Sequence, residues 1–242
     1  MRSSAGDLAL PADGAIRIHP HPEALPRLRR EGPGRNRFDD PEANFAVRYA
    51  ADSVLGAATE TMARFRPHPP TESVLQEVEG VENYEEPEFV HDPSLGVADW
   101  LSQQSVGALK LSAPSPVVLD IEDALLLDIL DSDPIVRAAL EQSGLGTDSD
   151  PVRLDAAIIR LGGPVGRPIT QAVSLALHRS TPGLDAIAYW SRLDSTQRCW
   201  AIYDHVPVEV VVTPLNPAND SHHSAIGSVA IRFGIDVPSE WL

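Results

Sequence analysis

The chain has 242 residues, of which 43% are hydrophobic, so it is long enough to bury one substantial core. Its formal net charge of −16 disfavours general nucleic-acid binding, because that function needs a basic surface. The single cysteine, Cys199, excludes an internal disulfide and a cysteine-based zinc site, and it suits a cytoplasmic location. The sequence lacks both the apolar segment of a signal peptide and the ~18 apolar residues of a membrane span.

The first part of the chain predicts two short strands and a helix. Residues 1–14 are small and polar, and we expect them to form a flexible leader. Strands are predicted at residues 15–18 and 45–49. A helix is predicted to begin at Asp52 or Ser53, since either side chain can cap free backbone N–H groups.

An acidic stretch and several helices are predicted for the middle of the chain. Residues 66–93 are acidic and rich in proline, which indicates an excursion over the surface. The segments that follow are a helix at 97–101, strands at 107–111 and 116–119, and helices at 122–130, 134–142, 151–161 and 170–178. The helix at 122–130 is predicted to bury Leu125, Leu126, Ile129 and Leu130. Residues 162–166 are interpreted as a helix stop and turn, so Thr170 is the expected cap of the last helix.

The last quarter of the chain predicts mainly strands, at residues 186–189, 199–203, 208–212 and 226–231. Strands at both ends with helices between them predict an α+β fold in a single domain, residues 15–242. Strictly alternating strand–helix–strand units are missing, which counts against a Rossmann fold.

Four polar residues are candidates for a site. Arg37 precedes the strand at 45–49, and Tyr49 ends it. Glu60 lies among apolar helix positions, so it either reaches solvent or faces a cleft, and burial statistics alone favour solvent. Ser191 follows a predicted strand, where it is either a turn residue or presents its hydroxyl to a cleft.

Other chemistry-bearing residues have simpler interpretations. The histidines are assigned to polar loops rather than to metal sites: His19 with His21, and His222 with His223 beside Asp220. The carboxylates of residues 120–133 are predicted to lie on the solvent face of a helix. Cys199 lies in a predicted buried strand and is interpreted as a structural thiol. No metal site is therefore predicted.

The order of several short motifs resembles the RES domain, a family named for its Arg, Glu and Ser. The motifs are Ile16-Arg17-Ile18, GRNRFDDP at 34–41, VRYAA at 47–51, ATE at 58–60, and LDAIAYWSR at 184–192 followed by CWAIYD. The resemblance extends from about residue 15 to about residue 212 and implies an ADP-ribosyltransferase-like fold. It also implies an enzyme that cleaves NAD⁺ at the nicotinamide–ribose bond, as a phosphorylase or a glycohydrolase. The alternatives are an ADP-ribosyltransferase that modifies a protein and a catalytically silent interaction module.

The resemblance also implies roles and partners. Glu60, Arg37 and Ser191 would act in catalysis, and Arg17, Arg37, Tyr49 and Ser191 would bind NAD⁺, which is the substrate rather than a cofactor. The implied protein partner is a helix-turn-helix (Xre-type) antitoxin of a toxin–antitoxin pair. Two features depart from the family pattern: Asp39 follows Phe38 where an asparagine is usual, and Arg35 leaves open which arginine reaches the ligand.

These implied roles agree with the chemistry of NAD⁺. Guanidinium groups form charge-assisted bonds with a diphosphate. An aromatic ring such as that of Tyr49 can stack on the positively charged nicotinamide. A carboxylate such as Glu60 can stabilise the positive charge that develops on the ribose.

Overall fold

The computed structural model describes residues 8–20, 34, 36–67, 96–113, 115–146, 149 and 151–242. Within these ranges the chain forms one α+β domain around a mixed sheet, which confirms the predicted fold class. Arg35, residues 1–7 of the predicted leader and nearly all of the predicted acidic excursion lie outside the described residues.

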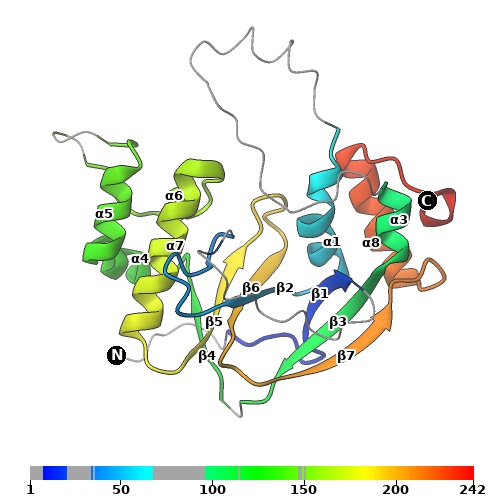
Figure 1. Cartoon of the computed structure of the whole chain (residues 1–242), viewed down its shortest axis with the longest axis horizontal. Helices are drawn as coiled ribbons and strands as arrows, with labels where there is room; N and C mark the ends of the chain where they lie inside the picture. Colours follow the sequence, from blue (N-terminus) through cyan, green and yellow to red (C-terminus); the bar gives the residue numbers. More distant parts are fainter. Residues whose placement is uncertain are drawn as a thin grey trace, which may run out of the picture.

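Seven strands form the sheet of the described chain, in the order β4-β5-β6-β2-β1-β3-β7 (Figure 1). They are β1 (Ala15–Pro20), β2 (Val47–Ala51), β3 (Gln104–Leu111), β4 (Val117–Asp120), β5 (Leu184–Trp190), β6 (Arg198–Tyr203) and β7 (Val208–Pro214). Neighbouring strands are antiparallel except β4 and β5, which are parallel.

The pairing of β1 with β2 is the weakest junction of the sheet. These strands share the single register pair Ile16–Ala51, whereas β2 pairs with β6 from Val47 to Ala51. Beyond their one shared pair, β1 and β2 therefore diverge, and the sheet opens between them (Figure 1).

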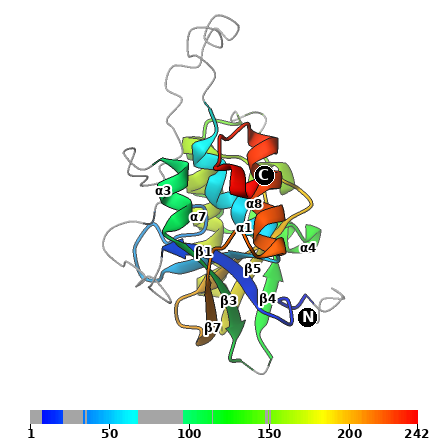
Figure 2. The ribbon, with the colours of Figure 1, turned by 90° about the vertical axis from the view of Figure 1, so that its right-hand side faces the viewer.

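The helices gather in two groups, near opposite ends of the sheet (Figure 1), and Figure 2 is seen from the side of the group that carries the C-terminus. One group contains α1 (Val54–Met62), α3 (Val97–Ser102) and α8 (Asp220–Phe233), with the 3-10 turns η1 (Ala63–Phe65) and η2 (Ser239–Trp241). The other contains α4 (Ala124–Asp131), α5 (Pro134–Gln142), α6 (Ala156–Ile159) and α7 (Gly163–Ser180). No helix within the described ranges is both long enough and apolar enough to cross a membrane.

Helix α1 is capped by Ser53, one of the two predicted capping residues. The Ser53 hydroxyl accepts a hydrogen bond from the Gly56 N–H at 3.0 Å, while Asp52 instead accepts one from the Trp200 indole at 2.5 Å. The helix buries Ala57, Ala58 and Met62 and so fixes the orientation of the residues beside them.

The predicted strand at 226–231 is wrong, because these residues lie inside α8. The Asn219 side chain accepts hydrogen bonds from the N–H groups of Ser221 and His222, which caps the helix. The buried positions are spaced as on one face of a helix: His222, Ala225, Ile226, Val229 and Ala230. The predicted hairpin loop around His222 and His223 is wrong for the same reason.

The predicted start of α7 is also wrong. The helix begins at Gly163 rather than Thr170, so residues 162–166 do not stop a helix. Pro164 lies in the first turn, where its missing N–H costs nothing. The Thr170 hydroxyl donates to the Gly166 carbonyl inside the helix instead of capping it. The predicted helix at 151–161 is reduced to α6, with Asp155 as its cap.

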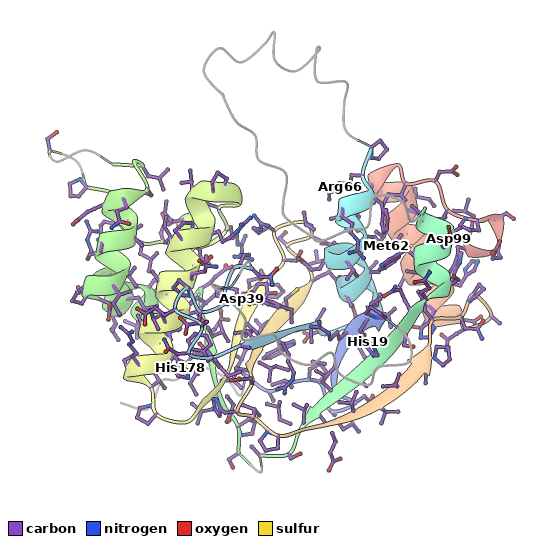
Figure 3. All side chains as sticks on the ribbon, in the orientation of Figure 1. His19, Asp39, Met62, Arg66, Asp99 and His178 are labelled. Carbon is purple, nitrogen blue, oxygen red and sulfur yellow. The ribbon has the colours of Figure 1, made fainter. Side chains whose placement is uncertain are left out.

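Two further predictions concern burial. In α4 the buried residues are Leu127 and Leu130, whereas Leu125 and Ile129 are 71% and 66% exposed, so the predicted face is wrong. His19 is buried within β1, in space that Gly107 leaves open, and not in a loop (Figure 3). His21 lies outside the described residues.

Candidate functional site

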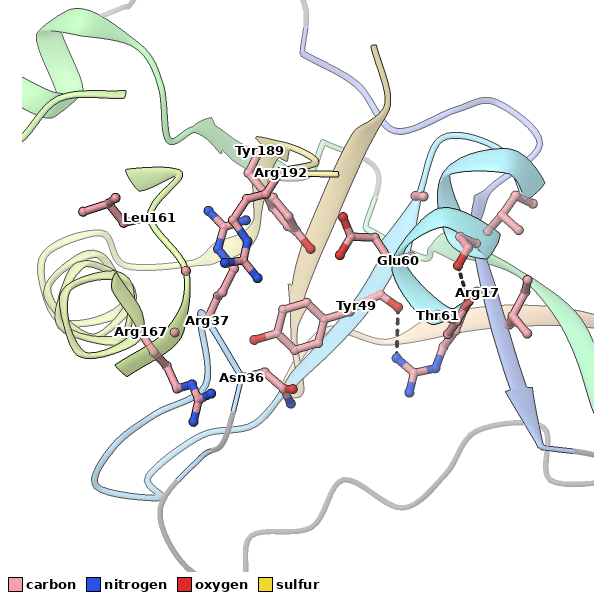
Figure 4. Close-up of a pocket in the computed structure, with 17 residues that line it drawn as sticks. Arg17, Asn36, Arg37, Tyr49, Glu60, Thr61, Leu161, Arg167, Tyr189 and Arg192 are labelled. Atoms are coloured by element: carbon pink, nitrogen blue, oxygen red, sulfur yellow. Dashed lines mark hydrogen bonds between the residues drawn. The ribbon is translucent and has the colours of Figure 1, made fainter. Parts of the chain in front are cut away.

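A cavity of about 350 Å³ lies where β1 and β2 diverge, between the two helix groups (Figure 4). Its wall comes from both strands, from α1, from residues 161–163 and Arg167 at the start of α7, and from Tyr189 and Arg192 at the end of β5. Cavities of about 300–1,000 Å³ are typical of small-molecule sites. Because the wall combines segments from much of the chain, only the folded protein forms it.

The structure brings the predicted site residues to this cavity. Arg17, Arg37, Tyr49 and Glu60 line it. Ser191 is 1% exposed and lies behind the wall, where its hydroxyl donates a hydrogen bond of 2.5 Å to Oε1 of Glu60. These two residues are 131 positions apart in the chain, so their contact is a product of the tertiary fold.

The Ser191 hydroxyl is fixed by three hydrogen bonds. Besides donating to Glu60, its oxygen accepts from the N–H groups of Leu193 and Asp194 at 3.1 and 3.2 Å. The loop after β5 therefore orients the hydroxyl, and the hydroxyl orients the carboxylate. Figure 4 shows Glu60 on the α1 side of the cavity, pointing toward Tyr189.

The ring of Tyr49 is held in place through its hydroxyl. This hydroxyl donates to Oδ1 of Asp39 at 2.8 Å and accepts from the Phe38 N–H at 2.9 Å. Burial, followed by the charge of Asp39, raises the pKa of Tyr49 well above its usual value, so the hydroxyl stays protonated. Asp39, where the resemblance expects an asparagine, thus holds the ring against the cavity wall.

Arg17 and Arg37 are both anchored by backbone carbonyls. Nη1 of Arg17 donates to the Tyr49 carbonyl at 2.9 Å, and Nη2 of Arg37 donates to the Ile159 carbonyl at 2.6 Å. The Arg37 guanidinium carbon also lies 5.1 Å from the ring centres of both Phe38 and Tyr189. Burial lowers the pKa of each arginine. The Nε atom of each is buried and makes no hydrogen bond among the described residues.

Sequence reasoning missed four polar or aromatic residues of the wall: Asn36, Arg167, Tyr189 and Arg192. Tyr189 and Arg192 flank Ser191 within one motif, and this position next to a candidate residue could have identified them as site residues. No sequence feature identified Arg167, because the start of α7 was predicted to lie after it.

The remaining candidates do not form a second site. Within the described ranges, no group of three or more His, Cys, Asp or Glu side chains could hold a metal ion. Cys199 is buried in β6, and burial raises the pKa of its thiol, so it exists as the poorly reactive neutral form.

Comparison with known proteins supports the resemblance of the motifs. A family model described as the RES domain matches residues 15–223 of the 242-residue chain, which includes Arg17, Arg37, Tyr49, Glu60 and Ser191. Neither the curated proteins nor the solved structures give a match, so the likeness to ADP-ribosyltransferases stays a prediction. The extent of the family match shows that this chain belongs to the RES domain family.

Proposed function

We propose that this RES-domain protein is a toxin-like enzyme that cleaves NAD⁺ at the nicotinamide–ribose bond and releases nicotinamide. One observation carries the proposal: Ser191 holds the Glu60 carboxylate at 2.5 Å on the wall of a cavity that also contains Arg17, Arg37 and Tyr49. This set combines a fixed negative charge, cations and an aromatic ring, which NAD⁺ requires in one place.

Glu60 is the proposed electrostatic catalyst. As the C–N bond breaks, the bonding electrons leave with nicotinamide and positive charge develops on the ribose. A carboxylate that is already oriented stabilises this charge without the cost of reorganising solvent. Ser191 lies behind the wall and fixes the carboxylate, so its proposed effect on the ribose passes through Glu60. Water as acceptor yields ADP-ribose and a proton, whereas phosphate as acceptor yields ADP-ribose that carries the phosphate on the anomeric carbon of the same ribose.

Tyr49 and the arginines are the proposed binding residues. The Tyr49 ring offers its face to the cationic nicotinamide, and its anchored hydroxyl keeps the ring from turning away. Arg17 and Arg37 are the proposed contacts of the diphosphate, since a buried guanidinium gains most from an anionic partner.

The direct test measures nicotinamide after purified protein is incubated with NAD⁺, both with and without phosphate. We expect release in at least one condition, and a Glu60→Gln variant that is about 10²–10³-fold slower at an unchanged melting temperature. Glu209→Gln is a matched control, because Glu209 is exposed on β7 away from the cavity. The absence of nicotinamide under both conditions contradicts the proposal. Isotopic label from NAD⁺ that stays on a protein band identifies ADP-ribosyl transfer instead.

The RES family is associated with antitoxin partners, and we include in the proposal a helix-turn-helix protein that covers the cavity. The net charge of −16 favours a partner with a basic contact surface. Co-expression with the product of a neighbouring reading frame tests this: a stable complex with suppressed nicotinamide release is expected. If that product neither binds nor inhibits, it is not the partner.

A further inference from the structure

The cavity has two chemically different sides (Figure 4). Glu60, Thr61 and Arg17 lie on the side of α1 and β1, whereas Arg37, Arg167 and Arg192 gather on the side of α7, with Tyr49 between the two. Three arginines at one wall are unexpected in a chain whose acidic residues exceed its basic ones by 35 to 19. The arginine side therefore needs a separate explanation from the catalytic carboxylate.

The Arg192 guanidinium occupies space that a side chain at residue 162 would fill. A Cβ atom on Gly162 would lie only 1.9 Å from Nη1 of Arg192. The backbone of Gly162, with φ −104° and ψ −175°, is open to any residue, so what the glycine provides is space for the end of the Arg192 side chain. Arg192 makes no hydrogen bond or ion pair with the rest of the described chain, although its guanidinium reaches the cavity.

The start of α7 adds hydrogen-bond donors to the same wall. Gly162 caps this 18-residue helix without any side-chain hydrogen bond, and Gly162 and Gly163 both line the cavity. The first N–H groups of a helix lack partners within the helix, and the helix dipole places positive charge there. Such an end favours an anion, most of all a phosphate.

Arg37 supplies a second observation that favours an anion at this wall. Its Nε is buried with no hydrogen-bond partner in the described structure, while its Nη2 is anchored on α6. Burial has the largest effect and lowers the pKa of Arg37, Tyr189 raises it, and Arg192 is near enough to lower it further by charge repulsion. An anion between the two guanidinium groups would remove this repulsion.

We propose that Arg37, Arg192 and Arg167, together with the first turn of α7, form a phosphate subsite of this cavity, and that Arg192 and Gly162 set its affinity. The inference rests on the proposed function for the ligand's identity: the phosphate belongs either to the diphosphate of NAD⁺ or to free phosphate that acts as acceptor. Arg192 lies at the rim, where it would engage the phosphate on entry, whereas Arg37 lies deeper.

Two substitutions test the subsite in different ways. Arg192→Gln removes the charge, whereas Gly162→Ala keeps every charge and displaces the Arg192 guanidinium with a methyl group. Gly96→Ala is the matched control, because a Cβ atom there would meet nothing within 4 Å. Calorimetry with pyrophosphate is expected to show a Kd that is at least about 10-fold higher for both test variants, as for the loss of one charge-assisted hydrogen bond. The Kd of Gly96→Ala is expected to equal that of the wild type.

Kinetics then identify the source of the phosphate. If the KM for NAD⁺ of Arg192→Gln is higher when no phosphate is added, the subsite binds the diphosphate of the substrate, because an interaction made equally with the bound substrate and the transition state has been lost. An unchanged KM with a lost response to added phosphate assigns it to the acceptor. Pyrophosphate binding that falls in a protein with no nicotinamide release supports the subsite and removes the proposed function. If Arg192→Gln binds pyrophosphate and turns over NAD⁺ as the wild type does, the proposed subsite is wrong. If Gly162→Ala does not fold, the result for Arg192→Gln alone decides whether the subsite exists.

Discussion

At the scale of single residues, Asp39 shows how a departure from the family pattern is accommodated. Among the described residues, its carboxylate accepts from the Tyr49 hydroxyl at Oδ1 and from the backbone and side-chain N–H groups of Asn36 at Oδ2, at 3.0 and 2.9 Å. An asparagine would provide one oxygen for the same donors. Asp39 therefore couples the loop before β2 to the ring that faces the cavity.

Replacing Asp39 should loosen this loop. We expect Asp39→Ala to lower the free energy of unfolding by about 1–3 kcal/mol, because it leaves the buried Tyr49 hydroxyl without its acceptor. The KM for NAD⁺ should rise as the ring loses its fixed orientation. Urea denaturation and steady-state kinetics measure the two effects. Asp39→Asn keeps one acceptor oxygen, so its free energy of unfolding and its KM should lie between those of Asp39→Ala and the wild type.

Ser191 is expected to act through Glu60. Ser191→Ala should lower kcat by about 10-fold with a small change in KM, a smaller loss than Glu60→Gln causes, because the carboxylate remains but is no longer held. A purely structural serine would instead change the melting temperature and leave kcat per folded molecule intact. Activity corrected for the folded fraction distinguishes the two cases.

The residue-scale predictions differed in how far the sequence supported them. For Glu60, burial statistics favoured solvent, and only the order of the family motifs favoured a cleft. The structure places Glu60 at the cavity wall beside Ser191. No local pattern distinguishes a carboxylate that faces water from one that faces a cavity. In both cases the residue is polar and its neighbours along the helix are buried, so the two sequences look the same.

At the scale of elements, capping and burial explain where prediction failed. The segment Ile226–Ile231 contains β-branched residues that suggest a strand, yet it lies in α8, between the Asn219 cap and Gly234 in the left-handed conformation at φ 65°. In α4, a run of three leucines fits more than one helix face, so the sequence could not determine which face is buried. Long-range packing outweighed local preference in both helices.

The cap of α8 can be tested directly. Asn219→Ala should cost about 1 kcal/mol of stability, because the N–H groups of Ser221 and His222 lose their acceptor. Asn219→Asp preserves an acceptor oxygen and should remain within a few tenths of a kcal/mol of the wild type. Urea denaturation followed by circular dichroism measures both. Equal stability of Asn219→Ala and the wild type would contradict the assigned cap.

At the scale of the whole molecule, an ion pair joins the loop that orients Ser191 to α8. The Arg232 guanidinium contacts Asp194, whose N–H also binds the Ser191 hydroxyl. Arg232, then the Thr196 hydroxyl, lowers the pKa of Asp194 to about 2. Helix α8 is thus linked through one carboxylate to the loop behind the cavity wall.

This ion pair predicts a dependence of stability on pH. The pKa of an unfolded aspartate is about 3.9, and the folded value is lower, so the contribution of Asp194 is complete above about pH 4 and is lost as the pH falls toward 2. Asp194→Asn should therefore destabilise the protein at pH 6, and the difference from wild type should shrink between pH 4 and 2. Urea denaturation across this range measures it. If the difference in free energy of unfolding between Asp194→Asn and the wild type stays constant with pH, the lowered pKa of Asp194 contributes nothing to stability.

The sequence by itself determined the composition of the fold and the identity of the family. Strand and helix signals indicated the α+β class, and motifs spaced between about residues 15 and 212 resembled the RES domain, which the family match over residues 15–223 confirms. Such features depend on local order, which a linear chain carries. Only the tertiary structure decided that β1 and β2 part after one residue pair, and that α7 begins early enough to bring Arg167 and Gly162 to the opening. A cavity exists only where segments distant in the chain pack around unfilled space, and no local preference encodes that space.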